Sequence, residues 1–147
     1  MYHRYGALYG CLFDKLYKHF DGDLKGKTIA LWGLAFKPGT DDMREAPSLV
    51  LIERLKAAGC NVRAFDPVAI GEAKRRIGDS IYYANDIYDA LHEADALMLV
   101  TEWKEFRMPN WSIIRKAMNH PVIIDGRNIF DSHDLTEQGF TYYCIGR

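Results

Sequence analysis

Hydrophobic and polar positions follow two different rhythms along the chain. In the first twenty residues the apolar positions recur three or four residues apart, which places them on one face of a helix: Leu8, Tyr9, Leu12, Phe13, Leu16, Tyr17 and Phe20. Gly6 and Gly10 weaken such a helix, and Asp21-Gly22 ends it. The pattern predicts an amphipathic helix over residues 5–20. It either docks on the rest of the chain or is the end of an element whose partner lies outside the chain.

From Lys27 onward, short apolar runs alternate with helical segments. The runs predict strands at residues 28–33, 61–66, 80–83, 96–101, 122–125 and 141–144. Between them the spacing predicts helices at residues 47–58, 69–77, 86–92 and 112–118, and a short helix around Leu135. This alternation predicts an α/β fold: a Rossmann-like doubly wound, mainly parallel sheet flanked by helices and preceded by the amphipathic helix.

Composition narrows the class of protein. The chain has 147 residues, the length of one ordinary domain, and its 48% hydrophobic content is enough for a real core. A net charge of -1 argues against a general nucleic-acid binder held by phosphate contacts. The longest apolar stretch is too short to cross a bilayer, and no secretory signal opens the chain. We therefore expect a cytoplasmic protein that binds neither nucleic acid nor membrane.

Neither the cysteines nor the acidic residues form a metal pattern. Cys11, Cys60 and Cys144 are odd in number and lack a C-x-x-C spacing, so we expect no disulfide framework and no zinc site. They are interpreted as small buried residues, with a reactive thiol as the alternative. The acidic cluster of Asp41, Asp42 and Glu45 matches no oxygen-ligand loop, and no metal is expected there.

The predicted sheet places the chemistry at one edge. Ligands of open parallel sheets bind beyond the carboxyl ends of the strands, which here are the loops after residues 33, 66, 101 and 125, called the rim below. The first loop is unusually long, and the rim brings together four cations: Lys37, Arg44, Lys104 and Arg127. A helix amino end at Pro47 adds partial positive charge. The expected ligand is an anion, with phosphate first.

Two simpler interpretations stay open beside this one. The loop from Lys37 to Glu45 could be a solvated charged surface with weak ion pairs, and Arg127 could pair structurally with Asp125 or Asp131. The turn at residues 33–39 does not spell G-x-G-x-x-G, so it offers no close backbone approach to a dinucleotide pyrophosphate. Asp66 stands where a ribose-binding acid would stand, but Pro67 follows it. We interpret Asp66 as a cap at the strand end.

Several longer motifs point to a known family. Residues 26–48 read GKTIALWGLAFKPGTDDMREAPS, and they are followed in order by Phe65-Asp66-Pro67, Thr101-Glu102-Trp103 and Asp125-Gly126-Arg127-Asn128. Together these resemble the carboxyl-terminal domain of UDP-glucose dehydrogenases, within the wider nucleotide-sugar dehydrogenase family. The resemblance extends over residues 24–146, and the long first motif is its most specific part.

The resemblance implies a function for particular residues. Members of the family have an amino-terminal NAD-binding domain, a central helical dimerisation segment and a carboxyl-terminal domain that holds the nucleotide sugar; this chain resembles the third part. By position, Phe36 and Lys37 match an aromatic-lysine pair that contacts the substrate. Arg127 matches an arginine that reaches across to the sugar nucleotide of a facing subunit or neighbouring site, and Arg44 matches an arginine that lies towards the NAD. No catalytic residue is carried over.

The family's catalytic cysteine has no counterpart here. Residues 10–15 have a superficial likeness to its Gly-Gly-x-Cys context, but Tyr9 stands in place of the glycine that should precede Gly10, and the Asp and Lys are reversed. Cys11 lies instead on the apolar stripe of the leading helix. We therefore expect residues 1–23 to be the remnant of the central helical segment and residues 24–147 to be the nucleotide-sugar (UDP) binding domain, inactive alone.

Two kinds of function follow. In the first, the domain binds UDP-glucose or UDP and belongs to an NAD-dependent enzyme that makes UDP-glucuronate, completed by NAD-binding and central helical domains and able to form a homodimer. NAD is then bound by the full-length enzyme and not by this chain alone. UDP-N-acetyl-mannosamine and GDP-mannose are the alternative substrates. In the second, the chain is a non-catalytic nucleotide-binding or interaction module whose partner surface is the leading helix.

Overall fold

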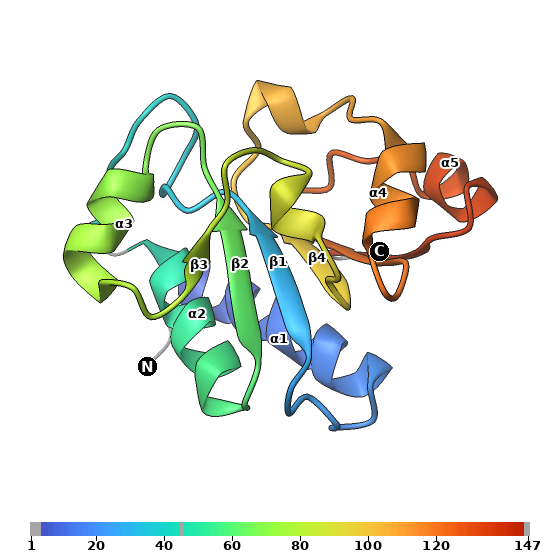
Figure 1. Ribbon diagram of the computed structural model, residues 1–147, viewed down its shortest axis with the longest axis horizontal. Coiled ribbons are helices and arrows are strands. Elements are labelled where there is room, and N and C mark those ends of the chain that lie inside the picture. Colours follow the sequence, from blue (N-terminus) through green and yellow to red (C-terminus); the bar gives the residue numbers. More distant parts are fainter. Residues whose placement is uncertain (1–3, 45, 146–147) are drawn as a thin grey trace.

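The computed structural model describes residues 4–44 and 46–145. Its helices and strands alternate along the chain (Figure 1). In order they are α1 (Arg4–His19), β1 (Thr28–Trp32), α2 (Pro47–Ala57), β2 (Asn61–Phe65), α3 (Ile70–Ile77), β3 (Tyr82–Tyr83), the 3₁₀ helix η1 (Asp89–Leu91), β4 (Ala96–Leu99), the 3₁₀ helix η2 (Lys104–Phe106), α4 (Trp111–Ala117), β5 (Val122–Asp125), α5 (Ser132–Glu137) and β6 (Thr141–Cys144).

The strands form a doubly wound parallel sheet, as the sequence predicts. Six strands lie in the order β3-β2-β1-β4-β5-β6, and every neighbouring pair is parallel. The order reverses between β1 and β4, where Trp32 is in register with Phe65 on one side and Leu99 on the other. The crevice beyond the carboxyl ends of these central strands is the place where such sheets bind ligands.

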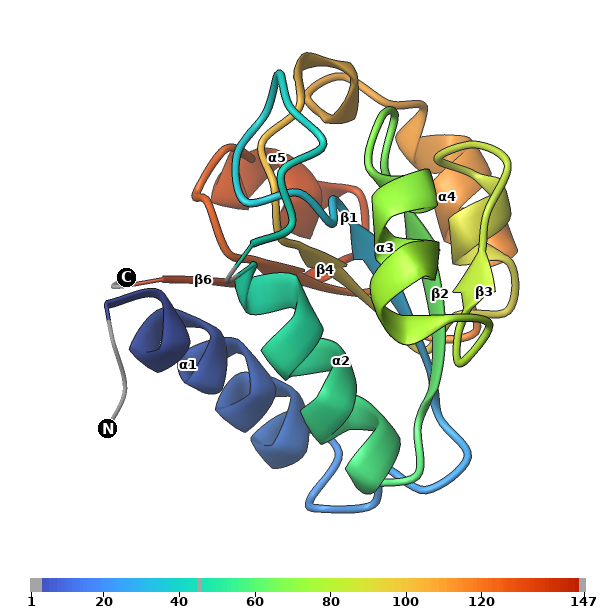
Figure 2. The same ribbon diagram turned by 90° about the vertical axis from the view of Figure 1, so that its left-hand side faces the viewer.

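Successive residues of the central strands point to opposite faces of the sheet and pack in two separate hydrophobic clusters. Ile29 and Leu31 of β1 pack in a cluster with residues of α1, α2 and α3, whereas Ala30 and Trp32 pack in a second cluster with residues of η1, α4 and α5. Figure 2 shows α1 and α2 crossing one face of the sheet side by side. Both faces are thus covered, which explains why the central strands are apolar throughout.

The leading helix α1 docks on the rest of the chain. Leu12 and Leu16 are completely buried in the first cluster, and the guanidinium of Arg54 in α2 lies 4.2 Å from the centre of the Phe13 ring. At the end of α1, His19 Nδ1 is 2.8 Å from the Tyr143 hydroxyl on β6. Of the two arrangements left open by the sequence, docking is the one found. The side chains of Leu8 and Tyr9 lie outside the described part of α1.

Some expected elements are shorter than their patterns indicate. The helix predicted over residues 86–92 is wrong in length and type, because only the 3₁₀ turn Asp89–Leu91 forms. The Asp86 carboxylate accepts hydrogen bonds from the amides of Tyr88 and Asp89, which favours a capped turn over a regular helix. The third strand is confined to Tyr82–Tyr83 at the sheet edge. No helix among the described residues is long and apolar enough to cross a membrane.

The three cysteines are all free thiols. Cys60 and Cys144 are buried, as expected of small core residues, while Cys11 is half-buried on α1. Cys11 borders a cavity of about 370 Å³ together with Lys15, Lys18 and Tyr143. It lies on the helix surface that faces β6 and not at the rim.

Candidate functional site

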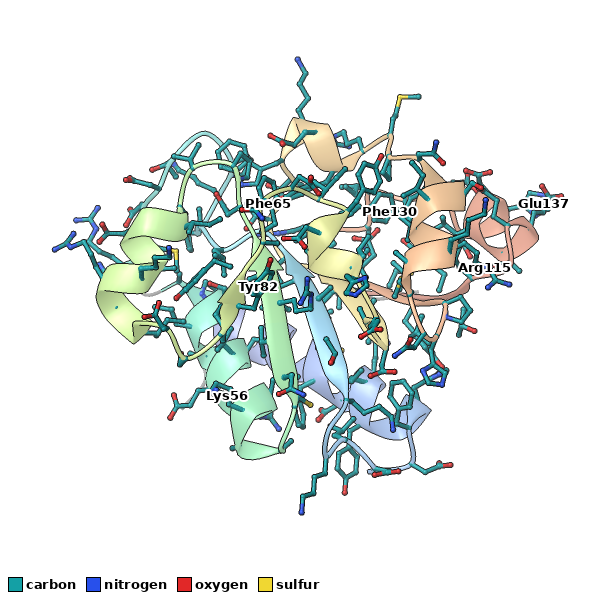
Figure 3. The ribbon with its side chains drawn as sticks, viewed as in Figure 1. Lys56, Phe65, Tyr82, Arg115, Phe130 and Glu137 are labelled. Atoms are coloured by element: carbon teal, nitrogen blue, oxygen red, sulfur yellow. The ribbon has the colours of Figure 1, made fainter. Side chains whose placement is uncertain are left out.

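Four loops leave the carboxyl ends of the strands at one end of the molecule. The loops after β1 and β4 rise from the upper end of the sheet in Figure 1, and Figure 3 shows Phe65 at the point where β2 ends. The loop between β1 and α2 has fourteen residues, 33–46, and carries the predicted Phe36-Lys37 pair. The rim expected from the sequence is therefore present as a structural feature.

Gly33 allows the first loop to leave β1 close against the end of β4. Its φ is +103°, and its amide donates a 2.8 Å hydrogen bond to the Phe65 carbonyl. A Cβ atom at this position would lie 2.4 Å from the Thr101 Cβ and 2.5 Å from the Thr101 amide nitrogen. Only glycine fits both the backbone conformation and the space.

Asp66 fixes the base of the rim from the end of β2. Its side chain is buried, and its carboxylate accepts five hydrogen bonds at 2.8–3.1 Å. The donors are the amides of Leu34, Ala35, Val68 and Ala69 and the indole nitrogen of Trp103. The interpretation of Asp66 as a strand-end cap is confirmed, and the cap also joins the loops after β1 and β4.

The carbonyl groups at the start of the first loop are held as well. Ser48, at the start of α2, donates its hydroxyl to the Leu34 carbonyl at 2.6 Å. Thr101, just after β4, donates its hydroxyl to the Ala35 carbonyl at 2.7 Å. Both hydroxyl residues are completely buried. The backbone immediately before Phe36 is consequently rigid, which favours a fixed position for the residues that follow.

Arg127 lies across the rim from the end of β5. Its amide bonds the Asp125 carboxylate at 2.9 Å, while its Nε donates to the Val100 carbonyl at 3.0 Å and its Nη2 to the Phe36 carbonyl at 3.4 Å. Nε also lies 2.9 Å from Oε2 of Glu102. The structure therefore brings the Arg127 guanidinium to the backbone of Phe36.

The ion-pair partner of Arg127 differs from the sequence-based alternative. Neither Asp125 nor Asp131 pairs with the guanidinium, because the Asp125 carboxylate accepts backbone amides and the Tyr142 hydroxyl, and Asp131 caps α5. The partner is Glu102, which the sequence analysis did not single out. Its place directly after β4, the neighbour of β5 in the sheet, was the signal that could have identified it.

Lys37 and Arg44 lie on the exposed part of the first loop. Lys37 follows the half-buried Phe36, and its ammonium makes no ion pair with the described residues. Arg44 pairs through Nε with the Asp42 carboxylate at 3.1 Å, and that hydrogen bond lowers the pKa of Asp42 to about 2. Arg44 borders a polar cavity of about 390 Å³ that reaches Glu72 and Arg76 on or beside α3.

The four predicted cations do not form one cluster. Arg127 meets the backbone of the first loop, whereas Arg44 lies towards α3. Lys104 is exposed at the start of η2. Among the described residues, no group of three or more His, Cys, Asp or Glu side chains is placed to hold a metal ion. Glu45 of the acidic cluster lies outside the described residues.

Comparison with known proteins identifies the family. Residues 30–132 match the model of the UDP binding domain of the UDP-glucose/GDP-mannose dehydrogenase family. This chain belongs to that family. The matched range contains the first loop, Asp66, Glu102 and Arg127, together with most of the sheet and its helices.

Relatives of known name agree with this membership. The chain is 50% identical over 141 residues to the UDP-glucose 6-dehydrogenase of Pseudomonas aeruginosa and 41% identical over 126 residues to the UDP-glucose 6-dehydrogenase TuaD of Bacillus subtilis. These alignments cover 92% and 86% of this chain but 31% and 27% of the two relatives. The chain therefore spans about a third of the length of the curated relatives it matches.

Solved structures share the fold. A UDP-glucose dehydrogenase from Pyrobaculum islandicum superposes with a TM-score of 0.78 at 26% identity, covering 93% of this chain and 29% of that one. The UDP-D-ManNAc dehydrogenase from Pyrococcus horikoshii has a TM-score of 0.73 at 31% identity, covering 97% and 31%. The predicted Rossmann-like fold is confirmed, and the family resemblance of the sequence motifs is confirmed with it.

Proposed function

We propose that this chain is the nucleotide-sugar-binding part of a UDP-glucose 6-dehydrogenase, which in full oxidises UDP-glucose to UDP-glucuronate. The observation that carries the proposal is the match of residues 30–132, the range that includes the rim, to a UDP binding domain. We assign the oxidation itself to the longer enzyme, since the surroundings of Cys11 do not match a catalytic cysteine. The chain alone is expected to bind ligand without turning it over.

Within this proposal Phe36, Lys37 and Arg127 bind the sugar nucleotide. Arg127 supports this role because its guanidinium bonds the Phe36 carbonyl and is only 19% exposed, so a cation is held in place at the rim. Lys37 is the next residue, with an exposed ammonium on a loop whose base is rigid. The two cations can bind the diphosphate of a nucleotide sugar, and the aromatic ring of Phe36 can pack against one of its rings.

Full activity requires NAD, which accepts hydride when it is bound. The first turn of this domain does not fit NAD in the manner of dinucleotide-binding folds, because the Leu34 and Ala35 amides already donate to Asp66. We place the NAD site on the missing NAD-binding domain, completed by the central helical segment. Arg44 is the one residue of this chain assigned to approach it, and its exposed guanidinium is compatible with that contact.

The proposal includes the setting of the enzyme. We place it in the cytoplasm, and a homodimer formed by the complete polypeptide is part of the proposal. The runner-up substrate is UDP-N-acetyl-mannosamine, favoured by the 31% identity to the UDP-D-ManNAc dehydrogenase of Pyrococcus horikoshii. GDP-mannose is the third candidate from the resemblance. Phe36, Lys37 and Arg127 are assigned to the nucleotide sugar as a whole, and the choice among the three sugars is left to the titration below.

A thermal-shift and calorimetric titration tests the proposed function. The purified chain is titrated with UDP, UDP-glucose, GDP-mannose and NAD, since a ligand that binds the folded state raises the melting temperature. UDP and UDP-glucose are expected to stabilise the chain and NAD is not. Lys37→Ala should weaken UDP binding by about tenfold or more, the effect of a hydrogen bond to a charged group.

The matched control is Lys116→Ala, which removes an exposed lysine from the last turn of α4, outside the four rim loops. Its UDP affinity should stay within about twofold of the wild-type value. If UDP binds Lys37→Ala as tightly as it binds the wild-type chain, the substrate role of Lys37 is refuted. Stabilisation by GDP-mannose alone would move the assignment to the GDP-sugar enzymes.

A further inference from the structure

Arg127 is held along one side by two carbonyl acceptors and one carboxylate, which come from two other loops. Nε donates to the Val100 carbonyl at 3.0 Å and lies 2.9 Å from the Glu102 carboxylate, and Nη2 donates to the Phe36 carbonyl at 3.4 Å. The side chains of Arg127 and Glu102 are 19% and 27% exposed. This contact is therefore partly withdrawn from water, to the same extent as the pair of Arg63 with Asp89.

A guanidinium has five N–H groups, and these contacts use only part of them. The acceptors occupy the side that carries Nε and Nη2. The opposite, end-on edge, made by Nη1 and the second N–H of Nη2, makes no hydrogen bond to the described residues. That edge is the one that can grip two oxygens of a phosphate at once.

We infer that Glu102 is a positioning residue: it locks the side of the Arg127 guanidinium so that the end-on edge is presented to the anion of the sugar nucleotide. The inference rests on the proposed function, because it names what prepares that same site. The two carbonyl acceptors are neutral, whereas Glu102 forms an ion pair with the guanidinium. Glu102 is thus the charged partner of Arg127 among the described residues.

Glu102 is itself well placed to act as a fixed support. The residue before it, Thr101, is anchored to the Ala35 carbonyl, and the residue after it, Trp103, is anchored through its indole nitrogen to Asp66. The Trp103 amide also donates to the Thr101 carbonyl at 3.0 Å, which makes a tight turn around Glu102. The backbone on both sides of Glu102 is therefore held to the base of the rim.

Positioning and simple electrostatics predict effects of opposite sign. A carboxylate beside an anion site repels the ligand, so removal of its charge should tighten binding if charge alone mattered. If Glu102 positions Arg127, its removal should weaken binding because the guanidinium must then be ordered when the ligand arrives. The sign of the change separates the two effects without any assumption about its size.

The test is calorimetric titration of the full chain with UDP. Glu102→Gln keeps the size of the side chain and should weaken binding by about fivefold or more, and Glu102→Asp should weaken it as well although the charge is retained. The matched control is Glu105→Gln, which removes the same charge from an exposed position in η2. Its affinity should be unchanged or slightly higher. In an Arg127→Lys background, Glu102→Gln should have less than about a twofold effect.

Unchanged or tighter binding by Glu102→Gln in an otherwise wild-type chain would overturn the inference. So would an equal loss in the Arg127→Lys background, because Glu102 would then act independently of Arg127. A second readout, the NMR signal of the Arg127 Nε–H, needs no ligand. It should be protected from exchange with water in the wild-type chain and lose that protection in Glu102→Gln.

The second readout separates this inference from the proposed function. If the wild-type chain fails to bind UDP, the proposed function of the isolated chain fails, and the Nε–H signal then decides the role of Glu102. Loss of protection in Glu102→Gln upholds the positioning role, and an unchanged signal overturns it. Melting temperatures of the variants show whether a lost signal comes from unfolding. If Glu102→Gln is unfolded, the Nε–H signal is measured in Glu102→Asp instead, where the positioning role again predicts loss of protection.

Discussion

Replacement of Gly33 by alanine tests how the first loop of the rim is attached to the sheet. Gly33 has a φ of +103°, and a Cβ there would lie 2.4 Å from the Thr101 Cβ and 2.5 Å from both the Thr101 amide nitrogen and Oγ1. Part of the obstruction is backbone, which cannot turn aside. Gly33→Ala must therefore push the loop away from the end of β4.

Three effects add to the cost of Gly33→Ala. The positive φ costs an alanine about 1–2 kcal/mol, and overpacking of a buried contact costs about 1–3 kcal/mol. Displacement of Thr101 also strains its 2.7 Å hydrogen bond to the Ala35 carbonyl, worth about 1 kcal/mol. We expect the free energy of unfolding to fall by about 3–5 kcal/mol, since these effects overlap in part.

Gly39→Ala is the matched comparison for this variant. Gly39 lies in the same loop with a φ of +85°, but a Cβ there would meet no atom within 4 Å. Only the conformational cost of about 1–2 kcal/mol should remain. Urea denaturation of the two variants isolates the steric part. If Gly33→Ala and Gly39→Ala lower the free energy of unfolding equally, the close approach of Gly33 to Thr101 adds no steric cost. The steric explanation for Gly33 would then be refuted.

Three further predictions concern buried and paired side chains. Asp66→Asn should lower the free energy of unfolding by about 3–5 kcal/mol in urea denaturation, because an amide cannot accept all five hydrogen bonds of the buried carboxylate. In Arg44→Ala, an NMR titration should show the pKa of Asp42 rising from about 2 towards 3.8. Burial raises the pKa of Cys60 to about 11, so a thiol reagent should modify half-buried Cys11 first and Cys60 only on unfolding.

Each of these has a contrary outcome. Asp131→Asn is the control for Asp66→Asn, because asparagine caps a helix such as α5 equally well and should change stability by less than about 0.5 kcal/mol.

The Asp42 carboxyl, with its pKa below 3.8, stabilises the fold above that pH and loses the contribution as the pH falls to about 2. Cys60, with its pKa above 9.0, acts in the opposite sense: its contribution is present below pH 9.0 and lost as the pH rises to about 11. An unshifted Asp42 in Arg44→Ala, or equal rates for both thiols, would contradict the contacts.

The sheet could be predicted because its signals are local. Each strand carries a run of apolar residues, and the continuous run near Leu97 indicated a central position that the strand order confirms. The element that failed, the helix over residues 86–92, lies where Asp86 and Asp89 make local hydrogen bonds that compete with a helix. A periodicity argument does not count those bonds, so it overestimates the helix.

The rim was predictable in outline and not in its pairings. Phe36 follows β1 and Arg127 follows β5, with β4 between them in the sheet, and their places after carboxyl ends predicted that they lie at the same edge of the parallel sheet. The pairing of Arg127 with Glu102 depends on side-chain reach between adjacent loops, and sequence spacing favoured the nearer Asp125. Whether Phe36, Lys37, Arg44 and Arg127 bind ligand stays a prediction.

Asp66 explains why a fold with the strand order of dinucleotide-binding proteins uses side chains for its proposed anion contacts. In such folds the amides of the turn after the first strand face the pyrophosphate. Here the Leu34 and Ala35 amides donate to the Asp66 carboxylate, and a phosphate at the same place would meet a buried negative charge. The cations that remain at the rim are on side chains beyond that turn, Lys37 and Arg127. Asp66 therefore has two effects. Its carboxylate occupies the amides that a dinucleotide would need, and the same hydrogen bonds hold the base of the loop that carries Lys37.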